Sequence, residues 1–198
     1  MNIGLTGGIA CGKSTVSAML VSRGALLVDA DQIARDVVQP GSPVLEQVAA
    51  HFGQAVIQED GSLHRKKLGE IVFGNTDARK QLEHILHPPI RKMIREQMEA
   101  YEKQFPDKLV VVDIPLLFES DLSFMFEEVL VVYVPPHIQV ERLMRRDNLT
   151  ESAANNRINA QMSIEEKRKL ADIVIDNSGT WEDTLASVER FWLGKGLS

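Results

Sequence analysis

The sequence has a single cysteine, Cys11, so it cannot form an internal disulfide, and a reducing compartment is expected. Its apolar runs are short, and Val129–Val134, one of the longest, could not span a bilayer. Met1–Thr6 lack the basic segment of a signal peptide. The chain is also poor in positive charge: 22 Lys and Arg stand against 28 Asp and Glu, whereas a nucleic-acid coat needs a large basic surface. These absences predict a soluble, cytoplasmic protein with neither nucleic-acid nor membrane partners. We expect a monomer or a small homo-oligomer, although no sequence feature selects between the two.

What the chain does contain is an alternation of strand-like and helical segments. Its 198 residues, 44 % of them hydrophobic, are enough to bury a core without disulfides or a structural metal. Five short runs are nearly continuous in Val, Leu and Ile, as in parallel strands that are covered on both faces. These runs are Ile3–Thr6, Ala25–Asp29, Leu109–Ile114, Val129–Val134 and Ile173–Ile175. Helical patterns lie between them, which predicts an α/β fold with a five-stranded parallel sheet between layers of helices.

Two helical stretches are too long to be simple crossovers. Residues 32–106 hold several expected helices, the last from Ala78 to about Lys103 with a break at Pro88-Pro89. Residues 148–170 are rich in charge and short of large apolar side chains, as expected for a mobile polar flap. The predicted organisation is therefore a core with two helical elaborations. The core comprises residues 1–31, 107–147 and 171–198.

The sharpest motif is Gly7-Gly8-Ile9-Ala10-Cys11-Gly12-Lys13-Ser14, which fits the pattern G-x-x-x-x-G-K-[ST] between a strand and a helix. In such a loop the backbone N–H groups and the helix N-terminus bind phosphate oxygens. Lys13 is predicted to contact the β- and γ-phosphates of a nucleotide, and the Ser14 hydroxyl to bind Mg²⁺. Cys11 is interpreted as a small filler rather than a redox nucleophile, because the loop needs only a small side chain there.

Three aspartates end or follow two of the expected strands, where ligands bind in open α/β sheets. Asp31 is predicted to be the general base on an acceptor hydroxyl. Asp29 either helps to hold Mg²⁺ through water or caps the next helix, and capping is the alternative for Asp31 as well. Asp113 follows Val110–Val112 and is predicted to orient Mg²⁺ through its water shell.

Basic and apolar side chains complete the predicted site. Arg142 and Arg146 share one helix face, so they could stack on adenine and neutralise phosphate charge, whereas Arg145 is expected in solvent. Asn177 either hydrogen-bonds a purine edge or belongs to a turn. The run Leu116-Leu117-Phe118 follows the third strand and either joins the core or contacts substrate.

Two histidines and the absence of other motifs bear on the class of protein. His84 and His87 lack a third ligand at a metal-binding spacing, so His87 is interpreted as structural or as a substrate contact. The chain has no N-K-x-D motif, which argues against a guanine-specific switch protein. A base beside the acceptor and cations around the phosphoryl group favour a small-molecule kinase. Another P-loop kinase for a nucleotide or a sugar, and a nucleotide-dependent binding module, remain the alternatives.

Five blocks together resemble the dephospho-CoA kinase family, in the family's order and spacing from Met1 to about Gly179. They are Gly4–Ile9 leading into Gly12-Lys13-Ser14, Asp29–Arg35, Leu86–Arg91, Pro115–Glu119 and Ala171–Asn177. The P-loop alone occurs in many families, but the D-A-D, H-P and P-L-L-F-E blocks together are specific. One departure is Ala10-Cys11, where the family commonly has Gly-Ser. Positions that contribute only backbone N–H groups tolerate Ala and Cys.

The resemblance implies transfer of the ATP γ-phosphoryl group to the ribose 3′-hydroxyl of dephospho-CoA, giving CoA and ADP. It also implies a build like that of nucleoside monophosphate kinases, in which residues 32–106 are a CoA-binding domain and residues 148–170 a lid. ATP and dephospho-CoA are then the small-molecule partners, with Mg²⁺ as cofactor. The predicted catalytic residues are Asp31, Lys13 and Arg142. The predicted ATP-binding residues are Gly8, Cys11, Gly12, Lys13, Ser14, Thr15, Val16, Arg142, Arg146 and Asn177; the substrate-binding residues are Asp31, Arg35, His87, Leu116, Leu117 and Phe118; the metal-binding residues are Ser14 and Asp113.

Overall fold

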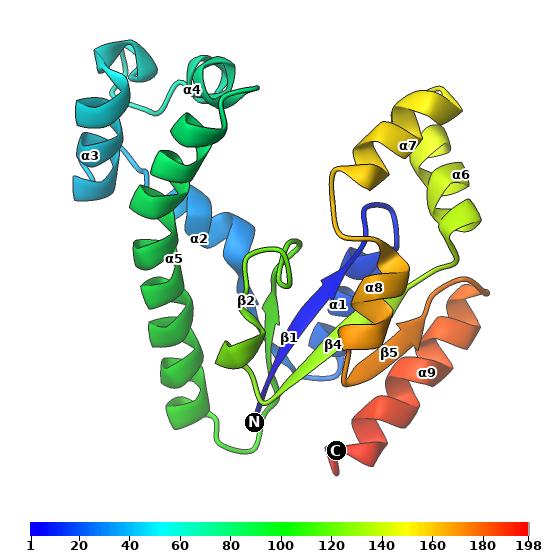
Figure 1. Ribbon diagram of the computed structural model, residues 1–198. Helices are drawn as coiled ribbons and strands as arrows, with labels where there is room; N and C mark the ends of the chain where they lie inside the picture. The colour runs from blue at the N-terminus through cyan, green and yellow to red at the C-terminus, as the bar shows by residue number, and fades with distance from the viewer. Residues whose placement is uncertain (198) are drawn as a thin grey trace. The chain divides into compact units, whose positions relative to one another are not determined.

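The computed structural model describes residues 1–197, and its core is a five-stranded sheet in the order β2-β3-β1-β4-β5 (Figure 1). The strands are β1 (Asn2–Gly7), β2 (Leu26–Asp29), β3 (Val110–Asp113), β4 (Glu128–Tyr133) and β5 (Ile173–Asp176). β1 pairs in parallel with β3 and β4, and β4 pairs in parallel with β5. The predicted α/β fold and all five predicted strands are confirmed, with boundaries that move by one residue or so.

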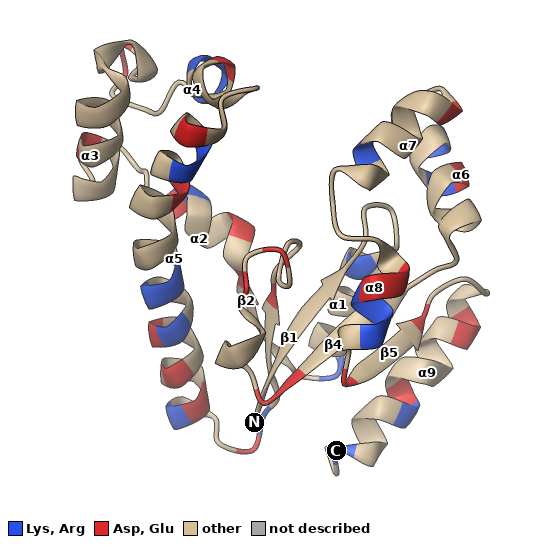
Figure 2. Ribbon diagram, in the orientation of Figure 1, with Lys and Arg blue, Asp and Glu red and all other residues tan. Residues whose placement is uncertain are grey.

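Burial explains why these runs form the centre of the sheet. Every residue of β1 is buried, as are Val110–Val112 and five of the six residues of β4. Helices α1 and α9 pack against each other and against strands β1 and β5, and α8 packs against β4. The charged side chains gather on helices and at strand ends and are nearly absent from the strands themselves (Figure 2). Strands covered on both faces need continuous apolar sequence, which is the pattern that the chain supplies.

The helices follow the predicted segments closely, with one exception. They are α1 (Lys13–Ser22), α2 (Ala30–Asp36), α3 (Pro43–Phe52), α4 (Arg65–Val72), α5 (Thr76–Gln104), α6 (Pro136–Asp147), α7 (Glu151–Asn159), α8 (Ile164–Leu170) and α9 (Trp181–Gly194), with short 3₁₀ turns η1 (Gln54–Val56) and η2 (Ser123–Met125). The predicted break at Pro88-Pro89 is wrong, because α5 continues through both prolines. Two prolines remove only two hydrogen bonds from the helix, and the turns on either side continue it.

The chain divides into two compact units. One comprises Met1–Val28 together with the chain from Met98 onward, and it contains the sheet. The other is Asp29–Gln97, which holds α2, α3, α4 and most of α5. The finer division into a core, a CoA-binding domain and a lid stays a prediction. Among residues 1–197, no helix combines the length and the apolar character that crossing a membrane requires.

Candidate active site

The loop Gly7–Ser14 joins β1 to α1, and close backbone packing demands its glycines. Gly12 has φ +82°, and a Cβ placed on it would lie 2.1 Å from Asn177 Nδ2. A Cβ on Gly8 would lie 2.4 Å from Gln139 Nε2. Glycine alone meets both constraints without displacing a buried amide. The loop therefore keeps its shape through contacts with side chains that sit far away in the sequence.

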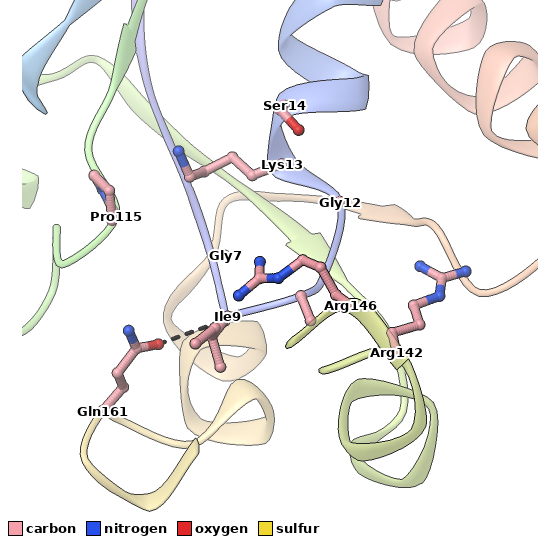
Figure 3. Close-up of a pocket in the computed structure, with 11 residues that line it drawn as sticks. Gly7, Ile9, Gly12, Lys13, Ser14, Pro115, Arg142, Arg146 and Gln161 are labelled. Atoms are coloured by element: carbon pink, nitrogen blue, oxygen red, sulfur yellow. Dashed lines mark hydrogen bonds between the residues drawn. The ribbon is translucent and has the colours of Figure 1, made fainter. Parts of the chain in front are cut away.

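This loop forms one wall of a pocket of about 460 Å³ (Figure 3). The pocket is lined by Gly7, Gly8, Ile9, Ala10, Gly12, Lys13, Ser14, Pro115, Arg142, Arg146 and Gln161. Of the residues predicted to bind ATP, the structure thus brings Gly8, Gly12, Lys13, Ser14, Arg142 and Arg146 to one cavity. This lining offers backbone donors, one ammonium group and two guanidinium groups, and it includes no acidic residue. It therefore suits a ligand with several phosphates.

Asp113 lies at the same edge of the sheet as the loop. It is the last residue of β3 and stands in register with Leu5 of β1, two residues before the loop begins. Its Oδ1 forms an ion pair with Lys13 Nζ, and these two side chains are only 15 % and 20 % exposed. Low exposure strengthens the Coulomb attraction between these two charges relative to a pair in solvent. Lys13, predicted to bind the phosphates, and Asp113, predicted to orient the metal, therefore hold each other in position.

Arg142 and Asn177 are hydrogen-bonded to each other, and Asn177 is also bonded to the loop. The Asn177 amide is buried, donates from Nδ2 to Cys11 O at 2.8 Å, and accepts at Oδ1 from Thr184 Oγ1 at 2.8 Å. Its side chain therefore fixes the loop to the start of α9, while the contact of Asn177 with a purine edge stays a prediction. Arg142 lines the pocket and donates to Asn177 O at 2.9 Å, which directs its guanidinium group.

The remaining residues of the predicted ATP-binding stretch divide between the pocket and the core. Cys11 and Val16 are fully buried, while Thr15 is half-buried and starts the backbone bonding of α1 to Gly12 O. Burial raises the pKa of the Cys11 thiol, so the thiolate that redox chemistry needs is disfavoured. This supports the interpretation of Cys11 as a filler of the loop.

Ala10 occupies a left-handed backbone conformation, with φ +62°. An L-residue other than glycine pays about 1 kcal/mol there, because its Cβ approaches the carbonyl oxygen. We therefore expect Ala10→Gly to raise the free energy of unfolding by about 1 kcal/mol, measured by urea denaturation. An unchanged or lowered value would contradict strain at this position.

Three predicted residues, Asp31, Arg35 and His87, belong to the unit Asp29–Gln97. Asp29 caps α2, because its side chain accepts from Gln32 N at 3.0 Å; the cap therefore does not need Asp31. Asp31 is exposed, and its carboxylate makes no hydrogen bond or ion pair within residues 1–197. Burial, reinforced by the charge of Arg91, lowers the pKa of His87, so the neutral imidazole is favoured.

The run Leu116-Leu117-Phe118 is split by the structure. Leu117 is fully buried, and its Cδ1 would lie 2.6 Å from a Cβ on Gly4, so it belongs to the core. Leu116 is 42 % exposed and Phe118 is partly exposed. The core alternative thus holds for Leu117, while the other two are free to contact a ligand.

Four residues around the loop were missed by the sequence reasoning: Gln139, Gln161, Glu119 and Lys167. Gln139 Nε2 donates to Ile9 O at 2.8 Å, and Gln161 Oε1 accepts from Ile9 N at 3.2 Å. These two glutamines carry no charge and belong to no recognised motif, so the sequence gives no signal that they contact the loop. Glu119 ends the P-L-L-F-E block, which was the one available signal, and Lys167 resembled any other charge of the polar flap.

A phosphate-binding loop at the carboxyl end of a parallel sheet, with arginines facing the same pocket, defines the class of P-loop phosphotransferases. The profile of the family described as "Dephospho-CoA kinase" matches residues 1–183. The chain belongs to the dephospho-CoA kinase family, whose enzymes carry out the final, ATP-dependent phosphorylation of coenzyme A biosynthesis.

Individual relatives agree with the family assignment. A dephospho-CoA kinase from Shouchella clausii is 50 % identical over 188 residues, which is 95 % of each chain. A crystal structure from Thermus thermophilus has a TM-score of 0.85 at 33 % identity and covers 100 % of this chain and 98 % of the other. A dephospho-CoA kinase structure from Campylobacter jejuni has a TM-score of 0.76 at 36 % identity and covers 98 % of each chain. The likeness therefore extends over the whole fold.

Proposed function

We propose that this chain transfers the γ-phosphoryl group of ATP to the ribose 3′-hydroxyl of dephospho-CoA, giving CoA and ADP. The observation that carries the proposal is the pocket at Gly7–Ser14, whose lining offers backbone donors and three cations and no carboxylate. Such an arrangement stabilises the negative charge of a transferring phosphoryl group. Full-length similarity to dephospho-CoA kinases selects the acceptor among the substrates that P-loop kinases use.

In this mechanism the nucleotide is held by the loop and by α6. Gly8 and Gly12 let the loop pack against Gln139 and Asn177, and Cys11, Thr15 and Val16 keep the loop and the first turn of α1 in shape. Lys13 neutralises the β- and γ-phosphates, and Arg142 assists the transferring group. Arg146 reaches the same pocket from the next turn of α6. Because these cations are already oriented, little reorganisation is needed when charge develops in the transition state.

Mg²⁺ is the cofactor that fits this donor set. Ser14 lines the pocket and the Asp113 carboxylate pairs with Lys13 beside it, so we assign the Ser14 hydroxyl and the Asp113 carboxylate to the ion or to its water shell. Among residues 1–197 no three metal-ligating side chains of the His, Cys, Asp or Glu type come together, and Mg²⁺ bound mainly through phosphates and water needs no such group. When bound, the ion supplies charge neutralisation at the phosphate oxygens.

Asp31 is proposed as the base that accepts the proton of the 3′-hydroxyl. The capping task at the start of α2 falls to Asp29, and the Asp31 carboxylate has no partner within residues 1–197, so it is available to a substrate. Arg35, His87, Leu116 and Phe118 are proposed to contact dephospho-CoA. The same proposal gives residues 32–106 to CoA binding and residues 148–170 to the lid.

The unit Asp29–Gln97 contains a basic pocket that suits this acceptor. Its volume is about 450 Å³, and Arg35, Arg65 and Lys66 line it together with His64, without any acidic residue. None of the three cations forms an ion pair within residues 1–197. Unpaired cations around a cavity bind phosphate groups well. We assign this pocket to the diphosphate of dephospho-CoA.

Removing one of these cations is expected to affect the acceptor alone. We expect Arg65→Met to raise the KM for dephospho-CoA about tenfold, the loss of one charge-assisted hydrogen bond, and to leave the KM for ATP unchanged. Arg95→Met is the matched control, because Arg95 is exposed in the same unit and does not line the pocket. Steady-state kinetics with each substrate varied in turn measures both constants. Equal KM values for dephospho-CoA in the two variants would contradict the assignment of the diphosphate to this pocket.

The proposed reaction is tested by ADP release from ATP and Mg²⁺ with dephospho-CoA, AMP, CMP or gluconate offered separately. Release with dephospho-CoA alone is expected. Release with another acceptor alone would favour a nucleotide or sugar kinase, and ATP binding without release would favour a binding module. We also propose that the reaction takes place in the cytoplasm, which the buried free thiol of Cys11 favours.

A further inference from the structure

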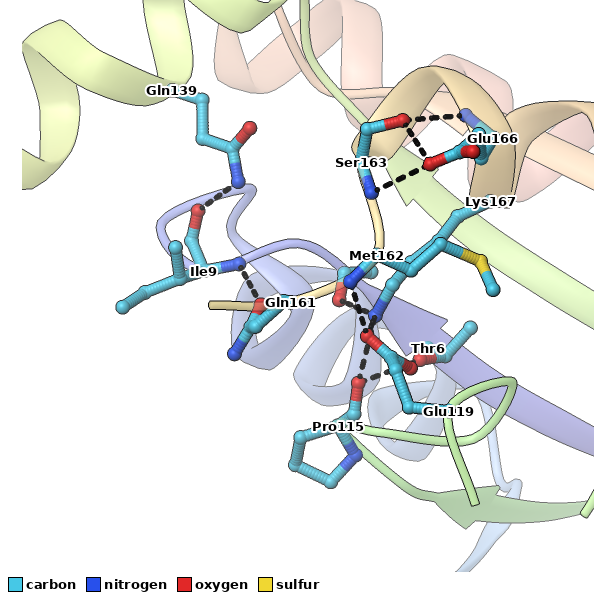
Figure 4. Close-up of polar contacts among 11 residues, drawn as sticks. Thr6, Ile9, Pro115, Glu119, Gln139, Gln161, Met162, Ser163, Glu166 and Lys167 are labelled. Atoms are coloured by element: carbon cyan, nitrogen blue, oxygen red, sulfur yellow. Dashed lines mark hydrogen bonds and ion pairs between the residues drawn. The ribbon is translucent and has the colours of Figure 1, made fainter. Parts of the chain in front are cut away.

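Lys167 is a lysine with no exposed surface, and it belongs to none of the predicted motifs. It projects from α8, and its Nζ lies 3.3 Å from Gly7 O, 3.2 Å from Pro115 O and 2.9 Å from Glu119 Oε1 (Figure 4). An ammonium group has three donors, and all three have an acceptor here. A lysine is almost never fully buried without such partners, because desolvating its charge is costly. The side chain is therefore held at one point between α8, the end of β1 and the segment after β3.

Helix α8 is itself fixed on the sheet, so the position of Lys167 is well determined. Tyr133 of β4 donates to Glu165 Oε1 at 2.6 Å, and the Arg168 guanidinium group lies 4.6 Å from the centre of the Tyr133 ring. Ser163 and Glu166 form a reciprocal cap at the helix start. The contacts of Glu165 and Arg168 with Tyr133 thus join α8 to β4 without Lys167. The buried charge of Lys167 is not needed for docking, since apolar side chains of similar size would serve as well or better.

Glu119 extends the contact from Lys167 to the nucleotide pocket. Its Oε1 also accepts from Met162 N at 3.0 Å, which fixes the connection between α7 and α8. The preceding residue, Gln161, lines the pocket and accepts from Ile9 N at 3.2 Å (Figures 3 and 4). Since Gln161 uses its oxygen on the loop, its two N–H donors remain for a ligand in the pocket.

We propose that Lys167 and Glu119 are positioning residues for ATP, and that Gln161 is the residue through which they act. Lys167 orients the carbonyl at the start of the phosphate-binding loop, and Glu119 places Gln161 over Ile9, where its amide donates to a phosphate oxygen of the nucleotide. The proposal deepens the proposed function because it adds Gln161 to the ATP site. It further makes the residues between α7 and α8 part of that site.

The test compares three proteins with the wild type. Gln161→Ala removes the group at the pocket, and the double variant Lys167→Met with Glu119→Met removes both charges together, so neither stays buried without its partner. Lys169→Met is the control, being the same substitution at an exposed position of the same helix. Calorimetric titration with Mg·ATP gives the affinity, kinetics gives KM and kcat, and thermal unfolding gives Tm.

We expect Gln161→Ala and the double variant each to weaken ATP binding about tenfold, with the KM for ATP rising in parallel and the KM for dephospho-CoA unchanged. Gln161→Ala and Lys169→Met should keep the wild-type Tm. If Gln161→Ala binds ATP as tightly as the wild type, the proposal is wrong, whether or not the double variant folds. If the double variant has a lower Tm and unchanged ATP affinity, Lys167 and Glu119 are structural only, which also overturns it. ATP affinity needs no acceptor, so failure to phosphorylate dephospho-CoA would count against the proposed function and not against this assignment.

Discussion

Lys13→Ala is expected to lower kcat/KM for phosphoryl transfer about 10³-fold. Lys13 is the one lysine that lines the nucleotide pocket, and its ammonium group is held close to the loop by Asp113. A cation fixed in a poorly solvated site stabilises developing charge far better than a mobile one in water. Alanine removes this charge from the pocket and also breaks the ion pair with Asp113, so the kinetic loss is read together with the stability of the variant.

The control for this experiment is Lys169→Ala, a lysine of the same unit that is exposed on α8. It should retain wild-type kinetics. Thermal unfolding of Lys13→Ala checks that the change is not a folding defect. If the Lys13→Ala enzyme turned over within a few-fold of the wild type, the assignment of this loop to ATP would have to be abandoned.

Asp31→Asn is expected to bind ATP normally and to lose between about 10² and 10⁴ in kcat, the range expected for the removal of a general base. Asparagine preserves the size of the side chain but accepts no proton at neutral pH. Because Asp29 rather than Asp31 caps α2, the helix itself should be unaffected. Single-turnover measurement of ADP formation, with ATP affinity measured separately, distinguishes chemistry from binding.

Asp36→Asn is the matched control, because it makes the same substitution at the other end of α2, where the carboxylate accepts from Gln32 Nε2. It should be close to wild type. An Asp31→Asn enzyme with unchanged kcat would exclude Asp31 as the base. Another group would then accept the proton of the acceptor hydroxyl, or the hydroxyl would lose its proton only after the new P–O bond has formed.

The sheet was predictable because its signal is local and dense. Val110–Val112 and Val129–Val132 could be nothing but buried strands once helical patterns flanked them, and the loop at Gly7–Ser14 fixed the direction of the sheet. The continuity of α5 was not predictable in the same way. A proline pair usually ends a helix. Here the helical turns on both sides of the pair, in a helix of 29 residues, offset the loss of the two backbone hydrogen bonds.

The site was predictable to the extent that its residues carry motif or charge. Lys13, Ser14, Arg142 and Arg146 were found because their spacing has a direct geometric meaning. Asn177 was noticed, but its hydrogen bond to Cys11 was not predicted, because the two residues are 166 positions apart in the sequence and no local pattern encodes such a contact. Gln139 and Gln161 were not predicted for the same reason. Both contact the Ile9 backbone, and that contact exists only in the folded chain.

The central claim is that the γ-phosphoryl group of ATP passes to the 3′-hydroxyl of dephospho-CoA. Its most direct test uses ATP labelled in the γ-phosphate, with Mg²⁺ and dephospho-CoA, and follows the label by phosphorus NMR and mass spectrometry of the products. Label is expected in the 3′-phosphate of CoA, in an amount equal to the ADP formed. Label recovered as inorganic phosphate, or at another position of the acceptor, would contradict it.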